Sequence, residues 1–238
     1  MSPFLGEFIG TMLLVILGDG VVANVILDKT KGFNGGLMSI TFGWGMAVFV
    51  GVFTSVSLGG GGHLNPAVTL AMAYLGKLDS SLVLTYLGAQ FLGAFVGAVI
   101  VWASYRQHFD ATTNADTKLG VFCTSPSIRN AASNIITEIV GTFVLVFGAL
   151  LFINPETKLG SIEALPVALL VIGIGLSLGG PTGYAINPAR DLSPRLAHFL
   201  LPIRGKRDSD WAYAWIPVVA PILGAFIAAF VFQIVKLG

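Results

Sequence analysis

Two copies of one tripeptide hold the side chains with the clearest capacity for chemistry. Asn65-Pro66-Ala67 and Asn187-Pro188-Ala189 each place a favoured helix-capping residue before a proline, which suits the first helical position. Each tripeptide therefore marks a helix start, and a helix N-terminus carries about half a positive charge. Such a triplet falls at roughly one in several thousand positions, so two copies at matched places argue against accident. The chemistry indicated is electrostatic rather than catalytic.

The other polar residues do not assemble an enzyme. Cys123 is the only cysteine, and the three histidines, His63, His108 and His198, are scattered, so we expect neither a disulfide framework nor a metal site. No nucleophile stands with a base, and no cofactor is expected. The net charge is +1 without a basic block, which argues against a nucleic-acid partner.

The composition indicates that the protein is surrounded by membrane lipid. Of the 238 residues, 55% are hydrophobic and 11% are charged, and the mean hydropathy is +0.84. A soluble domain carries about 25% charged residues. Because a membrane-crossing helix needs about 20 mostly apolar residues, six segments qualify as spans: 4–27, 37–58, 81–105, 132–154, 164–180 and 211–235.

Two further apolar stretches are too short to cross a bilayer. The glycine run 59–62 precedes residues 63–76, which would form about half a span, and the segment 179–183 precedes a second short helical pattern over 187–201. Non-helical backbone at membrane depth is tolerated only where it is buried in protein or lines a water-filled cavity. The glycine-rich segments therefore predict a pore.

The chain is an internal duplication. Glu7-x-x-Gly10-Thr11 recurs as Glu138-x-x-Gly141-Thr142, 131 residues later, and the second tripeptide follows the first by 122 residues. Each copy holds three spans and one half-helix, so the second copy enters the membrane from the opposite side. We expect an all-α membrane protein with six transmembrane helices and two re-entrant half-helices in an inverted repeat. It would be one channel domain over 1–238, with repeats at about 1–105 and 132–238.

These features resemble the major intrinsic protein family, the aquaporins and glycerol facilitators, over essentially the whole chain. The run from Gly62 to Val68, Gly-His-Leu-Asn-Pro-Ala-Val, makes the match specific. The resemblance implies a passive channel for glycerol, water and other small uncharged solutes that excludes protons and ions. It places Asn65 and Asn187 side by side at the pore centre. It further implies a homotetramer in the cell membrane with both termini cytoplasmic, although the distribution of basic residues favours the opposite orientation.

The resemblance also assigns a selectivity filter of four residues: Trp44, Gly175, Tyr184 and Arg190. Phe42 is the alternative to Trp44 on the second span. An alternative role for Arg190 is a purely structural ion pair with Asp191 or Glu138. Adjacent residues on a helix do not face each other, which argues against Asp191. An arginine inside the membrane is functional by default, which favours the filter role. Glycine at 175, where a water-only filter has histidine, favours the glycerol-facilitator branch.

Four residues are assigned to support of the pore: Glu7, Glu138, His63 and Asp191. Burying a carboxylate is costly unless donors satisfy it, so the two glutamates are expected to hold the non-helical loops. His63 is expected on the pore wall, and Asp191 also resembles the glycerol-facilitator branch. Asp19 lacks a counterpart in the second repeat and receives no role. An ion-coupled transporter would also use inverted repeats, but it needs a titratable or cation-binding site where this chain has two asparagines.

Overall fold

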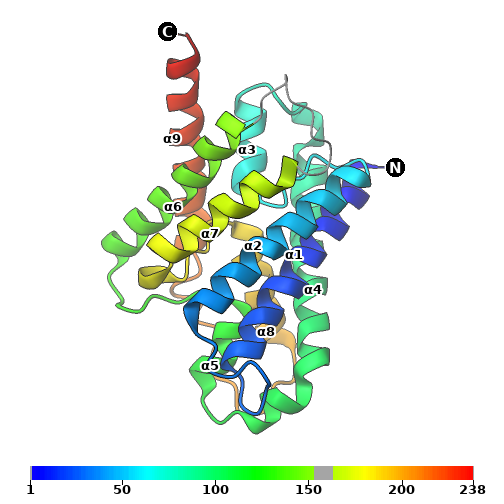
Figure 1. Cartoon of the computed structure of the whole chain (residues 1–238), viewed down its shortest axis with the longest axis vertical. Coiled ribbons are helices and arrows are strands. Elements are labelled where there is room, and N and C mark those ends of the chain that lie inside the picture. The colour runs from blue at the N-terminus through cyan, green and yellow to red at the C-terminus, as the bar shows by residue number, and fades with distance from the viewer. Residues whose placement is uncertain (1, 153–162, 238) are drawn as a thin grey trace.

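The fold is helical throughout the part of the chain that a computed structural model describes, residues 2–152 and 163–237 (Figure 1). The long helices are α1 (Pro3–Ile26), α2 (Gly36–Ser57), α4 (Val83–Ala111), α6 (Ala131–Phe152), α7 (Ala164–Thr182) and α9 (Ile216–Leu237). The shorter helices are α3 (Pro66–Tyr74), α5 (Ala115–Phe122) and α8 (Pro188–Leu200), and a 3-10 turn, Ser80–Leu82, precedes α4. Within the described ranges, six helices are long and apolar enough to cross a membrane. The predicted fold class is confirmed.

Two span boundaries and one short helix differ from the sequence-based expectation. The last span begins at Ile216 rather than 211, because residues 210–215 form turns and Pro217 suits the first turn of a helix. The third span continues past 105 to Ala111. Helix α5 was not predicted, since it has only 8 residues. The final two residues of the expected span 132–154 lie outside the described residues.

The two halves of the chain repeat one packing pattern. Helix α1 packs against α2 and α4, and α6 packs against α7 and α9. A Cβ added at Gly93 of α4 would lie 2.3 Å from the carbonyl oxygen of Phe8, and one added at Gly224 of α9 would lie 2.4 Å from that of Ile139. Ile139 and Gly224 each follow their counterparts by 131 residues. Glycine thus lets the paired backbones approach closely in both halves, as small residues do between membrane helices.

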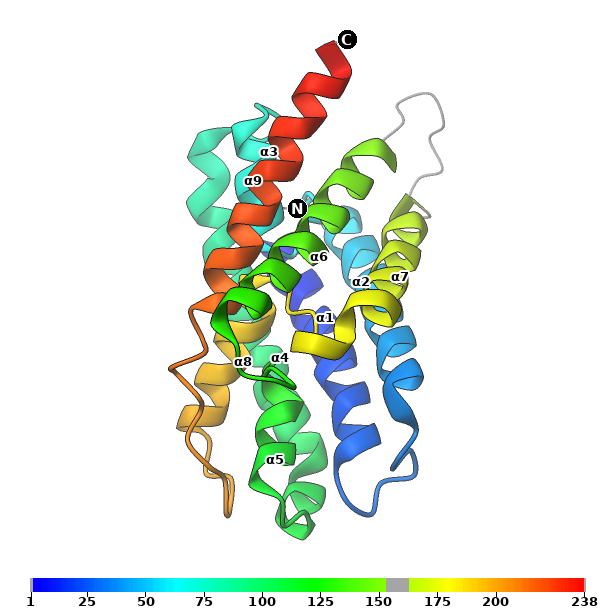
Figure 2. The ribbon, with the colours of Figure 1, turned by 90° about the vertical axis from the view of Figure 1, so that its left-hand side faces the viewer.

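The half-helices connect the two repeats. Helix α3, from the first repeat, packs against α9, and α8, from the second, packs against α4. In Figures 1 and 2, α3 lies in the upper half of the molecule and α8 in the lower half, so they enter from opposite sides. Both chain ends lie in the upper half with α3. Neither half-helix alone spans a bilayer, because 9 and 13 residues are too few.

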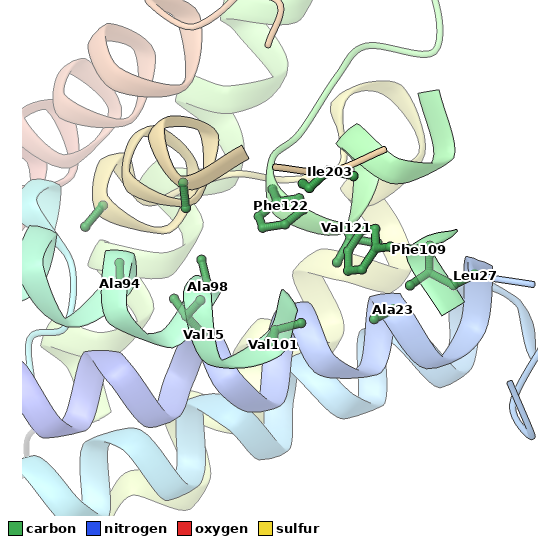
Figure 3. Packing of buried hydrophobic residues seen from close by; sticks show 12 residues of the cluster. Val15, Ala23, Leu27, Ala94, Ala98, Val101, Phe109, Val121, Phe122 and Ile203 are labelled. Atoms are coloured by element: carbon green, nitrogen blue, oxygen red, sulfur yellow. The ribbon is translucent and has the colours of Figure 1, made fainter. Parts of the chain in front are cut away.

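One buried cluster joins α1, α4, α5 and α8. Figure 3 shows Val15 and Ala23 of α1 beside Ala98 and Val101 of α4, with Phe122 of α5 close by. Ala189 and Ala197 of α8 belong to the same cluster. The outer faces of the helices are apolar and exposed, for example Met38 (73%) and Leu84 (81%), as a lipid solvent requires.

Candidate functional site

A cavity of about 700 Å³ runs between the two repeats. It reaches from Lys77, just beyond α3, to Arg190 in α8. One part of its wall is apolar and comes from α2, α6 and α7, for example Val48, Leu145 and Val167. Another part is formed by the non-helical segments 61–65 and 184–187 and carries the polar side chains of Asn65, Asn187 and the adjoining Arg190. The cavity wall is therefore amphipathic along a path that crosses the meeting point of the half-helices.

The two asparagines lock the half-helix N-termini together. Asn65 caps α3 by accepting from the backbone N–H of Ala67 at 2.9 Å, and Asn187 caps α8 by accepting from Ala189 at 3.0 Å. Each Nδ2 also donates across the contact: Asn65 to the carbonyl of Ile186, and Asn187 to that of Leu64, both at 2.8 Å. An amide nitrogen has two hydrogens. One N–H of each asparagine thus remains for a ligand in the cavity, which both residues line.

Glu7 holds the segment that leads into α3. Its carboxyl group accepts four hydrogen bonds: from Ser55 Oγ and the His63 N–H at 3.0 Å, and from the Leu64 N–H and Gln90 Nε2 at 2.8 Å. The two backbone donors are consecutive, and Leu64 has a left-handed φ of 51°. The four bonds compensate for burying the carboxyl group completely. Ser55 and Gln90 were not anticipated from the sequence.

Glu138 does the same for the segment before α8. It accepts from Thr182 Oγ1 at 2.7 Å and from the backbone N–H groups of Ala185 and Ile186 at 2.9 and 2.8 Å. Ile186 has a left-handed φ of 43°. The two glutamates thus take the N–H groups of the two residues before each asparagine, and the carbonyl oxygens of Leu64 and Ile186 accept from the asparagines.

Arg190 and Trp44 meet on the cavity wall. The Arg190 guanidinium carbon lies 4.3 Å from the centre of the Trp44 ring, within the range of a cation–π contact. Trp44 is 4% exposed and lines the cavity, whereas Phe42 is 59% exposed and does not line it, so the geometry favours Trp44 over the alternative Phe42. Among the described residues, Arg190 forms no ion pair with Asp191 or Glu138, the two structural partners considered from the sequence.

Tyr184 lies between the cavity and two glycines of α7. A Cβ at Gly175 would lie 2.9 Å from Cζ of Tyr184 and 2.6 Å from Cγ2 of Thr41, and one at Gly179 would lie 2.7 Å from Cδ1 of Tyr184. Gly175 does not line the cavity, although Tyr184 does. The expectation that Gly175 leaves open space for a solute is therefore corrected: the tyrosine ring fills that space. Gly175 affects the cavity through the position of this ring.

Asp191 lies away from the cavity, in a buried network. It accepts from the backbone N–H and the hydroxyl of Thr124, both at 2.7 Å, and from Arg195 at 2.8 and 2.9 Å. Arg195 is fully buried and also donates to the carbonyl of Thr124. This network ties the segment after α5 to α8. Arg195 was missed, although its i,i+4 spacing from Asp191 on an expected helix could have revealed the pair. Burial raises the pKa of the neighbouring Cys123 thiol, so it stays protonated.

His63 lies on the cavity wall beside the first loop. Its Nδ1 is 3.1 Å from Thr69 Oγ1, and its ring centre is 4.9 Å from that of Tyr86. Thr69 in turn accepts from Gln90, which also binds Glu7. The histidine therefore belongs to the network that supports the loop.

Comparison with known proteins agrees with this architecture. The profile of the major intrinsic protein family matches residues 1–232. A protein named "Probable glycerol uptake facilitator protein" from Thermotoga maritima is 54% identical over 96% of this chain and 97% of its own. The "Glycerol uptake facilitator protein" of Streptococcus pneumoniae (strain R6) is 50% identical over 98% of this chain and 99% of its own.

A solved structure leads to the same conclusion. The X-ray structure of the aquaglyceroporin from Plasmodium falciparum is 31% identical and matches with a TM-score of 0.86, covering 99% of this chain and 98% of that one. Sequence and fold agree over nearly the entire length. The chain therefore belongs to the major intrinsic protein family, whose members are membrane transporters rather than enzymes.

Proposed function

We propose that this protein is a passive channel that passes glycerol, water and other small uncharged solutes and excludes protons and other ions. The observation that carries the proposal is the meeting of Arg190, Trp44 and Tyr184 on the wall of one cavity. Aromatic faces suit the carbon backbone of a polyol, while a guanidinium donates to hydroxyl oxygens. The names of the relatives, glycerol uptake facilitators, favour glycerol as the solute.

The rest of the wall fits the same class of solute. An alcohol such as glycerol presents hydroxyls on one side and C–H groups on the other. The apolar side chains of α2, α6 and α7 suit the C–H groups, and the carbonyl-bearing segments before α3 and α8 suit the hydroxyls. Asn65 and Asn187 supply donors midway. A water molecule can use the same hydrogen-bonding groups.

Ion exclusion follows from the charges along the path. The N-termini of α3 and α8 face each other through the reciprocal asparagine bonds, and each end carries about half a positive charge. Arg190 adds a full positive charge on the cavity wall. In a low-dielectric pore these charges oppose protons and other cations. The same positive charges would attract anions, so they do not by themselves exclude them.

The test is solute flux through purified protein in liposomes, followed by stopped-flow light scattering. We expect both water efflux and glycerol entry to exceed those of empty vesicles. Trp44→Leu should change the ratio of glycerol to water permeability. Phe42→Leu, on the exposed side of the same helix, is the matched control and should leave the ratio unchanged.

Two results would reject the proposal. Faster water efflux with glycerol entry equal to that of empty vesicles would remove glycerol as a solute. Saturable uptake driven by a proton gradient would replace the passive channel with an ion-coupled transporter.

We further propose that the channel is a homotetramer in the cell membrane with cytoplasmic termini. The position of both chain ends on the side where α3 enters supports a common side for the termini. Protease added from outside should then cut the loop around residues 204–207, which follows α8. Cutting from the cytoplasmic side alone would reverse the orientation, and the mass of the detergent-solubilised assembly tests the tetramer.

A further inference from the structure

The hydroxyl group of Tyr184 is buried on the α7 side of its ring. A Cβ added at Gly175 would lie 3.1 Å from the hydroxyl oxygen and 2.9 Å from Cζ. One turn later, a Cβ added at Gly179 would lie 2.7 Å from Cδ1 and 3.0 Å from Cε1 of the same ring. Neither glycine lines the cavity, whereas Tyr184 does. The tyrosine therefore borders the solute path with its hydroxyl group turned away from that path.

Thr41 of α2 packs over the same glycine. It is fully buried, and the Cβ added at Gly175 would lie 2.6 Å from its Cγ2. The side chains of Thr41 and Tyr184 interact. Trp44, one turn after Thr41 on the same face of α2, lines the cavity, but Thr41 does not. Thr41 and the Tyr184 hydroxyl group thus lie together behind the cavity wall.

The hydroxyl group of Thr41 is not used within its own helix. Thr11, Ser39 and Thr142 each donate to the carbonyl oxygen four residues earlier, at 2.7–2.8 Å. Thr41 does not, and within the described part of the chain neither its Oγ1 nor the Tyr184 oxygen completes a hydrogen bond of ordinary geometry. A buried hydroxyl group without a partner is costly. Because a hydroxyl group both donates and accepts, one hydrogen bond between these two oxygens gives each of them a partner.

We propose that Thr41 is a positioning residue for glycerol selectivity: its hydroxyl group pairs with that of Tyr184 over Gly175 and keeps this polar group out of the solute path. This inference rests on the proposed function, because it assumes that Tyr184 borders the path of glycerol. With the pair intact, the tyrosine presents an apolar ring in a fixed position to the C–H groups of a polyol. Without its partner, the hydroxyl group would turn toward the cavity to be hydrated, and the ring would narrow the path.

The first test is Thr41→Val, which removes the hydroxyl group and keeps the branched shape. Glycerol and water permeabilities are measured by stopped-flow light scattering in the same proteoliposomes. We expect glycerol permeability to fall about fivefold, which corresponds to about 1 kcal/mol, and water permeability to fall less. Thr41→Ser keeps a hydroxyl group and should restore the ratio of glycerol to water permeability. Thr54→Val is the matched control, since it lies about 20 Å further along α2 and does not line the cavity, and it should leave the ratio unchanged.

The second test uses the background Tyr184→Phe, in which there is no hydroxyl group for Thr41 to hold. The permeability ratio of this variant serves as the new reference. Adding Thr41→Val to it should cause no further decrease in the ratio. A role of Thr41 in packing alone would lower the ratio in both backgrounds, so the double-mutant cycle isolates the contact between the two hydroxyl groups.

The outcomes separate this inference from the proposed function. Glycerol flux through the unmodified protein tests the function alone. If that flux is present, an unchanged ratio in folded Thr41→Val protein overturns the inference, because Thr41 then does not hold the ring. An equal decrease in the Tyr184→Phe background also overturns it, because the effect then comes from packing at position 41. If Thr41→Val fails to fold, Thr41→Ala compared with Thr41→Ser tests the loss of the hydroxyl group in the same two backgrounds.

Discussion

Replacing Gly175 with alanine should narrow the solute path, although the new methyl group does not itself enter the cavity. The Cβ would lie 2.6 Å from Cγ2 of Thr41 and 2.9 Å from Cζ of Tyr184. Carbon atoms in contact prefer about 3.5–4.0 Å. Relief therefore needs a displacement of about 1 Å. The Tyr184 ring lines the cavity, so the ring can move into the open space of the cavity.

The size of the effect follows from overpacking. Adding a methyl group to a filled site costs about 1–3 kcal/mol. If about 1 kcal/mol of this cost is added to the barrier for glycerol, flux falls about fivefold, and about 2 kcal/mol gives roughly thirtyfold. Water needs less lateral room than a three-carbon chain, so its flux should fall less. Glycerol flux should therefore fall by at least about fivefold, and the ratio of glycerol to water permeability should decrease.

Gly173→Ala is the matched control for this substitution. It lies on the same helix, two residues earlier, and a Cβ there meets no atom within 4 Å. Both substitutions gain about 1 kcal/mol of helix propensity, so the difference between them isolates the contact with Tyr184 and Thr41. Both permeabilities are measured by stopped-flow light scattering, at equal protein per vesicle.

An unchanged ratio in a folded Gly175→Ala protein would refute the reasoning, because Tyr184 would then not limit glycerol. An equal drop in Gly173→Ala would show that the effect comes from the helix and not from the ring.

Two further predictions concern charge and loop support. Arg190→Val should let protons or small cations leak while neutral-solute flux persists, since a fixed positive charge is lost from the cavity wall. A pH-sensitive dye inside vesicles measures the proton leak. Unchanged proton conductance would show that the half-helix ends exclude protons without Arg190. Glu7→Gln and Glu138→Gln should each lower the melting temperature in detergent, because the amide nitrogen cannot accept from a backbone N–H that the carboxyl group holds, and each lost bond costs about 1–3 kcal/mol. Unchanged melting temperatures in both variants would contradict the assigned role of the glutamates in loop support.

The sequence alone determined the parts of this protein that depend on neighbours along the chain and on the bilayer. Apolar length identified the six spans, because the membrane thickness sets how many residues a crossing helix needs. The Asn-Pro-Ala tripeptides marked the starts of α3 and α8, because capping is a local interaction. The recurrence of Glu7 as Glu138 revealed the duplication. Each repeat crosses the membrane three times, so the second copy is inverted. This count predicted that the two half-helices would meet.

The tertiary structure decided which side chains face the path. Phe42 and Trp44 are two residues apart on one helix and thus point about 200° apart, and only Trp44 faces inward. Helix α2 is apolar nearly all round, so its sequence gives no sign of which face is buried. The rotation of each helix is set instead by packing against distant segments, as in the contact of Gly18 with Trp44. For the same reason the contact of Tyr184 with Gly175 and the burial of Asp19 could not be predicted. Each depends on the relative rotation of helices that are far apart in the chain, and no local pattern records it.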